Sequence, residues 1–193
     1  FTNKAAKEMT ARLSSLVPIN TRGMWIGTFH GLCNRLLRAH YREAGLPQTF
    51  QILDSADQLA MVKRLLKNLN VDDEKYPPRE RCHLRNGQKE QGVRAAQAGA
   101  YDNYTPKRVE LYAEYETQCN REGVVDFAEL LLRCYELLQR NEPLRKHYLD
   151  RFRYILVDEV QDTNKLQYAW LKLLAGGGAV VFAVGDDDQS IYA

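Results

Sequence analysis

Two short apolar runs late in the sequence, each followed within two residues by acidic residues, constrain the fold most. Residues 154–157 precede Asp158 and Glu159, and residues 179–184 precede a second acidic segment at 186–188. Near-continuous apolar runs are typical of parallel strands that are covered on both faces. Such strands occur in α/β folds, which bind nucleotides at the carboxyl edge of the sheet. The pattern therefore predicts a parallel sheet with acidic groups at its ligand-binding edge.

A third apolar run, residues 24–27, is predicted as a strand that leads into an amphipathic helix. The apolar side chains of this helix recur at the spacing of one helical face, so that face is expected to pack while the opposite face is basic. The apolar stripe consists of Phe29, Leu32, Cys33, Leu36, Leu37 and Tyr41, and Arg35, Arg38 and Arg42 fall outside it.

The middle of the chain has a different pattern. A helix is predicted over residues 55–69, followed by a polar stretch and two further helices. The last of these is expected to begin at Asp126 as its N-cap, with Glu129 at the capping-box position. The sequence thus predicts an α/β sheet that is interrupted by a long all-helical insertion.

Length, composition and charge limit the class of protein. A chain of 193 residues with 45% hydrophobic and 27% charged residues is ordinary for one or two globular domains. No apolar run approaches the roughly 18 residues of a membrane-spanning helix, so no membrane partner is expected. The net charge is +2, but residues 1–50 are basic and residues 151–193 are acidic. This distribution suggests that the two ends bind different ligands. The alternative is that both are simply solvated faces.

Cysteine usage predicts reduced thiols and a cytoplasmic location. Cys33, Cys82, Cys119 and Cys134 are far apart and form no Cys-x-x-Cys pair, so neither a zinc ribbon nor a disulfide framework is indicated. His30 and Cys33 lie three residues apart on the predicted basic helix. No second pair supplies the other two ligands that zinc requires.

The carboxylates after residues 154–157 suit phosphoryl transfer. Asp158 could hold Mg²⁺, which prefers oxygen ligands and keeps several of its waters. Glu159 could orient and deprotonate an attacking water. The alternative is that Asp158 and Glu159 only end a strand and that Asp162 or Thr163 caps the next helix.

The segment after residues 179–184 favours the functional interpretation. If the two strands are neighbours, Gln161 and Gln189 are expected near one pocket, where an amide can donate to a phosphate oxygen. Asp186 begins a run of three aspartates, which is costly in an apolar setting unless a cation or several donors oppose it.

Two segments near the start suit contacts with nucleic acid. Hydroxyl, amide and backbone donors at helix N-termini fit phosphates, and aromatic side chains can stack on bases. The alternative is that each Thr is a cap and each Phe belongs to the core. The candidates are Phe1, Thr2, Asn3, Thr28, Phe29, His30 and Tyr192.

Four ordered segments resemble the motifs of superfamily 1 DNA helicases of the UvrD, PcrA and Rep type. Residues 1–9 resemble motif Ia, residues 27–31 motif Ib, residues 158–164 motif II and residues 184–192 motif III. Several intervening segments are also similar, so the resemblance extends along nearly the whole chain.

The resemblance implies a fold and a domain organisation. Residues 1–43 and 151–193 would be parts of a RecA-like domain, 1A, whose partial parallel sheet is interrupted by the helical domain 1B at residues 44–150. The activity implied is 3′ to 5′ unwinding of DNA in repair or replication, driven by ATP with Mg²⁺. Single-stranded and junction DNA would be partners, with repair proteins as further candidates.

The resemblance also assigns roles to residues. Asp158 would hold Mg²⁺, Glu159 would activate water, and Gln189 would sense the γ-phosphate. Gln161 and Asp186 would join Gln189 around the nucleotide, and the seven candidates named above would contact single-stranded DNA.

The sequence departs from the family pattern in what it lacks. No Gly-x4-Gly-Lys-Ser/Thr segment occurs, because the three glycines at 176–178 are followed by Ala179. Motifs IV to VI are also absent, so the chain alone is expected to be inactive. One alternative is a non-enzymatic module that binds single-stranded DNA or docks a partner through Arg35, Arg38 and Arg42. Another is the helicase subunit of a recombination nuclease.

Overall fold

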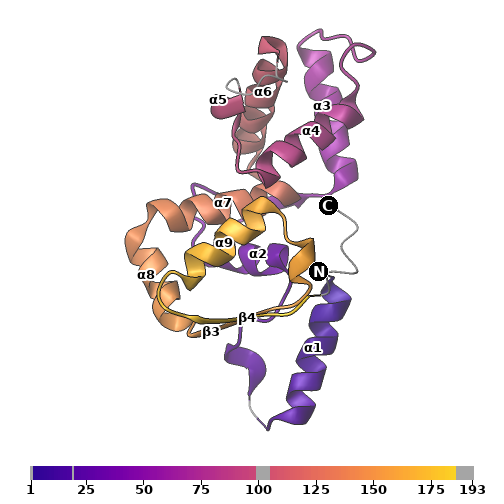
Figure 1. The fold of residues 1–193 in the computed structure, drawn as a ribbon. Coiled ribbons are helices and arrows are strands. Elements are labelled where there is room, and N and C mark those ends of the chain that lie inside the picture. Colours follow the sequence, from indigo (N-terminus) through magenta and orange to yellow (C-terminus); the bar gives the residue numbers. More distant parts are fainter. Residues whose placement is uncertain (1, 19, 99–104, 186–193) are drawn as a thin grey trace.

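The computed structural model describes residues 2–18, 20–98 and 105–185. Over these residues the chain is mostly helical, with short parallel strands (Figure 1). It is therefore a mixed α/β structure, as the sequence predicts.

The first helix, α1 (Asn3–Leu16), begins at Thr2, whose hydroxyl accepts a hydrogen bond from the Ala5 N–H at 3.1 Å. No residue of α1 is buried, and Figure 1 shows the helix beside the main body of the protein. A short 3₁₀ turn, η1 (Thr21–Gly23), follows it. The helix is thus held by its own cap and by local contacts.

The prediction of a strand at residues 24–27 is wrong. This segment has bends at residues 24 and 27 and pairs with no strand among the described residues. Its groups are engaged elsewhere: the Trp25 ring packs edge-on against Tyr148 and Phe152, with centroids 5.5 and 5.4 Å apart. The Met24 carbonyl accepts from Arg35 Nη1 at 3.2 Å. The apolar character therefore reflects packing against helices.

The predicted basic helix is α2 (Phe29–Ala39), and its apolar stripe buries Cys33, Leu36 and Leu37.

The next element, β1 (Gln51–Leu53), pairs in parallel with β2 (Val124–Asp126). The middle of the chain is therefore not all-helical. Strands of three residues are too short to show a reliable period in the sequence.

Helices form the rest of the middle segment. The helix predicted over 55–69 is α3 (Ser55–Asn68), and it is followed by α4 (Pro78–Glu90), α5 (Ala95–Ala98) and α6 (Pro106–Glu122). Figure 1 shows α3 to α6 gathered at one end of the molecule.

The predicted cap at Asp126 is confirmed. Asp126 accepts a hydrogen bond from the Glu129 N–H at 2.8 Å and begins α7 (Phe127–Arg140), which leads into α8 (Glu142–Arg151). One face of α7 is buried almost completely. The helix therefore forms a central part of the core.

The two late apolar runs form the predicted parallel pair. The strand β3 (Tyr154–Val157) pairs with β4 (Val180–Ala183), with Leu156 opposite Phe182. Between them lie η2 (Val160–Asp162) and α9 (Lys165–Ala175).

The β3–β4 pair is not covered on both faces by the described residues. Tyr154, Leu156 and Phe182 are 69%, 75% and 54% exposed, while Val157 is buried. Burial of both faces, which the apolar runs predict, is therefore not observed in this part of the chain.

The largest apolar core joins segments that are distant in the sequence. Residues of α2, α7, α8 and α9 share it, and a second core lies between α3 and α6. The division into residues 1–43, 44–150 and 151–193 stays a prediction. In the described ranges no helix is long and apolar enough to cross a membrane.

Candidate nucleotide and nucleic-acid site

The carboxylates of Asp158 and Glu159 stand at the carboxyl end of β3, as the sequence predicts. Asp158 is exposed, and its Oδ1 accepts a hydrogen bond from the Glu159 N–H at 2.9 Å. An exposed carboxylate suits Mg²⁺, which often takes one or two protein carboxylates together with phosphate and water oxygens. The described residues contain no cluster of three ligating side chains. The role of Asp158 as an Mg²⁺ ligand therefore stays a prediction.

Glu159 adopts an unusual backbone conformation. Its φ of 54° and ψ of 45° lie in the left-handed region, which few residues other than glycine adopt. Its Oε2 accepts a hydrogen bond from Gln161 Nε2 at 2.6 Å. The side chain is thus fixed by the residue two positions later.

The loop after β3 is joined to the end of β4 through the backbone. Val184 N–H donates to the Val157 carbonyl at 2.9 Å, and Val160 N–H donates to the Val184 carbonyl at 3.1 Å. The start of motif III therefore lies beside motif II. Asp186, Gln189 and Tyr192 lie outside the described residues, as does Phe1, so the shared pocket of Gln161 and Gln189 stays a prediction.

Motif Ib forms the N-terminus of α2. The Thr28 hydroxyl caps the helix by accepting a backbone N–H at 3.1 Å. Phe29 packs edge-on against Trp170 of α9, with ring centroids 5.9 Å apart, and its packing brings motif Ib beside the helix that follows motif II. His30 lies edge-on to Phe127 at 6.2 Å, and partial burial lowers the pKa of its imidazole.

The structure shows the two threonines in the capping role that the sequence analysis gave as the alternative, and their contacts with DNA stay a prediction. Thr2 and Thr28 both cap helices, and Asn3 is an exposed first residue of α1. Neither α1 nor α2 has an acidic residue in its first turn. Their N-terminal partial positive charge is therefore not offset locally, which favours an anion.

Two of the three arginines outside the apolar stripe, Arg35 and Arg38, lie in α2 and already have contacts within the chain. The Arg35 guanidinium lies 4.2 Å from the Trp25 ring, and that of Arg38 lies 3.6 Å from the Phe50 ring. Arg38 Nη1 also donates to the Phe50 carbonyl at 2.5 Å. These contacts make Arg35 and Arg38 part of the fold.

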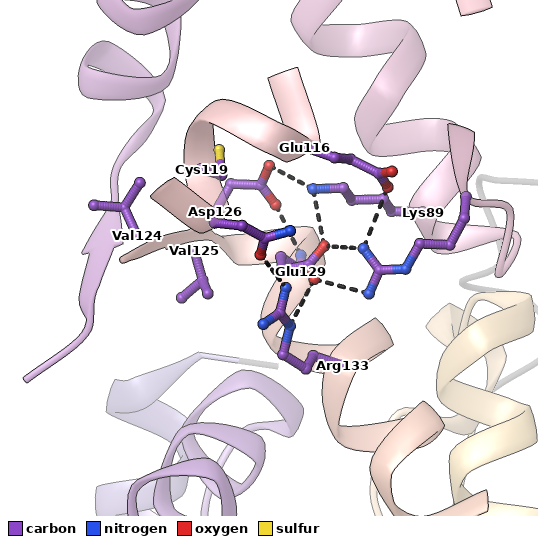
Figure 2. Close-up of a pocket in the computed structure, with 10 residues that line it drawn as sticks. Lys89, Glu116, Cys119, Val124, Val125, Asp126, Glu129 and Arg133 are labelled. Carbon is purple, nitrogen blue, oxygen red and sulfur yellow. Dashed lines mark hydrogen bonds and ion pairs between the residues drawn. The ribbon is translucent and has the colours of Figure 1, made fainter. Parts of the chain in front are cut away.

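A charged pocket that the sequence did not predict lies between α4, α6, β2 and α7 (Figure 2). Its cavity measures about 160 Å³. At its centre Lys89 Nζ is 2.8 Å from Asp126 Oδ2 and 3.1 Å from Glu129 Oε2. The lining residues are Lys89, Arg94, Glu116, Cys119, Asn120, Val124, Val125, Asp126, Glu129 and Arg133.

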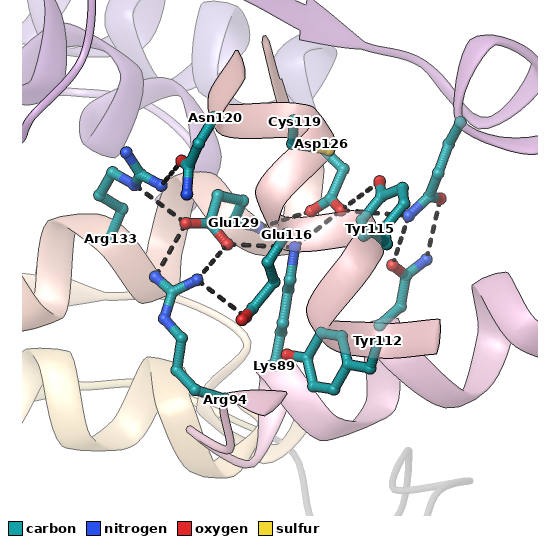
Figure 3. A network of polar contacts seen from close by, with 12 residues as sticks. Lys89, Arg94, Tyr112, Tyr115, Glu116, Cys119, Asn120, Asp126, Glu129 and Arg133 are labelled. Carbon is teal, nitrogen blue, oxygen red and sulfur yellow. Dashed lines mark hydrogen bonds and ion pairs between the residues drawn. The ribbon is translucent and has the colours of Figure 1, made fainter. Parts of the chain in front are cut away.

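Two arginines and a tyrosine complete this network (Figure 3). Arg94 binds Glu129 in a bidentate arrangement, with both N–O distances 2.8 Å, and Arg133 Nε donates to Glu129 Oε1 at 2.9 Å. Tyr115 donates its hydroxyl proton to Asp126 Oδ2 at 2.7 Å. Each buried carboxylate therefore has several donors.

The network determines the protonation states of its members. Burial disfavours the charge of Glu129, but Lys89, Arg94 and Arg133 hold the pKa of this carboxyl well below its usual range. Burial likewise disfavours the charge of Lys89, whose pKa is nevertheless raised by Glu129 and Asp126. Because partners of opposite charge stabilise the charged forms of both Glu129 and Lys89, the network suits a structural role.

The four cysteines are free thiols, as the sequence predicts. Cys33 and Cys134 are fully buried, and Trp170 Nε1 donates to Cys134 Sγ at 3.3 Å. In the part of the chain that is described, His30 and Cys33 belong to no metal-binding cluster.

Comparison with known proteins agrees with this arrangement. The family model described as the UvrD/REP helicase N-terminal domain matches residues 1–193. The chain belongs to the UvrD/Rep helicase family. This membership confirms the resemblance that motifs Ia, Ib, II and III indicate.

Relatives within the UvrD/Rep family carry helicase names. DNA helicase II of Escherichia coli (strain K12) is 52% identical over 193 residues, and that of Haemophilus influenzae is 49% identical over 197. The ATP-dependent DNA helicase PcrA of Staphylococcus aureus is 39% identical over 196 residues. Each match covers 100% of this chain and 27% of the relative. The chain thus spans about a quarter of the length of these relatives.

Proposed function

We propose that this chain is part of an ATP-dependent DNA helicase that moves 3′ to 5′ along single-stranded DNA and unwinds duplexes in repair or replication. The observation that carries the proposal is the match of residues 1–193 to the family, together with Asp158 and Glu159 at the carboxyl end of β3. ATP is the proposed substrate, and single-stranded and junction DNA, with repair proteins, are the proposed partners. The proposed location is the cytoplasm.

The proposed chemistry is hydrolysis of ATP, which releases the γ-phosphate. Mg²⁺, held through Asp158, would neutralise charge on the phosphates. Glu159 accepts a proton from water as the water oxygen bonds to the γ-phosphorus. The bond from that phosphorus to the β–γ bridging oxygen breaks, and ADP leaves with the electron pair. In this proposal Gln189 donates to a phosphate oxygen and Asp186 lies beside the nucleotide, while Gln161 acts through the Glu159 carboxylate that it holds.

The proposed DNA contacts use the N-termini of α1 and α2. Thr2, Asn3, Thr28 and His30 stand where backbone N–H groups and the helix dipole favour a phosphate. The reduced basicity of His30 makes its imidazole a neutral hydrogen-bonding group at pH 7. Phe29 contributes through its packing on Trp170, and Phe1 and Tyr192 are the proposed stacking residues.

DNA-stimulated phosphate release tests this proposal. In the full-length protein that carries this chain, release should be rapid and should fall at least about 10³-fold in Glu159→Gln, because the base is lost. The isolated 193-residue chain should release no phosphate, since it lacks a Gly-x4-Gly-Lys-Ser/Thr loop. Release from the pure isolated chain that disappears in Glu159→Gln would show that the missing loop is not required.

A non-enzymatic module is the second candidate. Such a module would bind single-stranded DNA or dock a partner without hydrolysing ATP. Weak binding whose logarithm falls steeply with the logarithm of salt concentration would indicate DNA, and salt-insensitive binding to a protein would indicate docking. The contacts of Arg35 and Arg38 within the chain weigh against a docking surface on the basic face of α2.

A further inference from the structure

The left-handed conformation of Glu159 needs a local cause. Residues other than glycine persist in this region only where the surrounding structure fixes them. At Glu159 the fixing contacts come from η2 and from the end of β4. Gln161 Nε2 holds the Glu159 carboxylate at 2.6 Å, and Val160 N–H donates to the Val184 carbonyl at 3.1 Å.

Gly185, the next residue after Val184, has no space for a side chain. A Cβ at this position would lie 2.7 Å from Val160 Cγ1 and 3.4 Å from the Gln161 backbone nitrogen, and it would overlap Gln161 Oε1. The two shortest of these contacts are closer than real Cβ contacts, so a side chain here would push the Gln161 and Val160 side chains away from the end of β4.

Conformational freedom does not explain this glycine. The described glycines with a positive φ are Gly45, Gly92, Gly123 and Gly178, and Gly185 is not among them. Gly185 therefore has a backbone that other residues can adopt. What distinguishes it is the close approach of the Gln161 amide.

We propose that Gly185 and Gln161 act together as positioning residues for the carboxylate of Glu159. Gly185 leaves room for the Gln161 side chain against the end of β4, and Gln161 in turn donates to Glu159 Oε2. The inference rests on the proposed ATPase function of Glu159. It assigns to the first residues of motif III a steric role in setting the geometry of motif II.

The arrangement predicts an effect on turnover rather than on binding. In the full-length protein, Gly185→Ala should lower kcat for DNA-stimulated ATP hydrolysis at least tenfold, because small displacements of a catalytic group are costly. The KM for ATP and the affinity for single-stranded DNA should change less than twofold. Gln161→Ala should show the same division between kcat and KM.

A double variant tests whether the two residues act as a unit. Residues that act through one group have non-additive effects, so Gly185→Ala with Gln161→Ala should have a kcat within about threefold of the slower single variant. Gly87→Ala is the matched control, because a Cβ at Gly87 of α4 meets nothing within 4 Å. Its kcat should stay within twofold of wild type.

Three results would overturn the inference. The first is a wild-type kcat in Gly185→Ala. The second is a double variant in which the fold-reductions of kcat from the two single variants multiply. The third is a Gln161→Ala variant that raises the KM for ATP and leaves kcat unchanged. Because Gln161→Ala introduces no overlap, it keeps the test valid if Gly185→Ala fails to fold. Absence of ATP hydrolysis in the wild-type protein would instead contradict the proposed function.

Discussion

Lys89 and Asp126 form an ion pair in which Nζ and Oδ2 are 2.8 Å apart and both side chains are only 2% exposed. The pair joins α4 to the residue that ends β2 and caps α7. Lys89 Nζ also lies 3.1 Å from Oε2 of Glu129, which is in the first turn of α7. One buried cation therefore fixes α4 against the start of the central helix.

Replacing Lys89 should destabilise the chain strongly. Lys89→Met leaves Asp126 and Glu129 without their shared cation, and breaking a buried pair in this way costs about 3–5 kcal/mol. Urea unfolding measures this loss. Arg12→Met is the control, because the Arg12–Glu8 pair is exposed and its removal should change stability by less than about 1 kcal/mol. A loss below about 1 kcal/mol in Lys89→Met would contradict the structural role of the network.

Acid should weaken the fold through Glu129. The pKa of Glu129 is far lower in the folded chain than the roughly 4.3 of an unfolded glutamate. Its contribution to stability is therefore complete above that value and is lost as the pH falls toward the folded pKa. Between about pH 5 and pH 3, where the unfolded group begins to bind its proton, wild type should lose stability more steeply than Glu129→Gln. Urea midpoints across this range provide the measurement, and parallel curves would refute the prediction.

The cysteines should differ widely in reactivity. Burial raises the pKa of the Cys119 thiol to about 11 and raises that of Cys33 well above its usual value. Cys82 is only half-buried, although burial raises its pKa as well. Alkylation of the native chain, followed by mass spectrometry, should label Cys82 first, at least about tenfold faster than the buried thiols, because reaction requires an accessible thiolate. Equal labelling of all thiols would show that the core opens readily.

The capping box of α9 should contribute measurably to stability. Asn164 accepts the Gln167 N–H at 2.8 Å, and the Gln167 side chain accepts the Asn164 N–H at 3.1 Å. Asn164→Ala should therefore cost about 1 kcal/mol in urea unfolding. Asp162→Ala is a useful comparison, because the sequence analysis allowed Asp162 or Thr163 as this cap, whereas the structure shows Asn164 there. A larger loss in Asp162→Ala would reverse this assignment.

Local signals in the sequence predicted local features of the fold. The strands predicted at residues 154–157 and 179–184 and the helix predicted at residues 55–69 match β3, β4 and α3 to within one residue at each end, and the cap at Asp126 is also as predicted. The position of Asp158 and Glu159 after β3 follows from the same patterns. Apolar runs, helical periodicity and capping residues are local patterns, so they can be recognised without tertiary information.

Features that depend on tertiary packing were missed. Lys89 and Asp126 are 37 positions apart, and nothing in either local sequence indicates the other. Trp25 lies in an apolar run that resembles a strand, yet its ring packs against α8. The left-handed conformation of Glu159 was also not predictable, because no glycine or asparagine marks the turn.

That backbone conformation implies a trade-off between stability and activity at a single position. A left-handed residue other than glycine costs about 1–3 kcal/mol, a cost that glycine at the same position would avoid. The chain keeps a glutamate at the end of β3 despite this cost. Selection for thermal stability alone would therefore be expected to replace Glu159, and a variant obtained in that way would be more stable but would lack the carboxylate that the proposed hydrolysis requires.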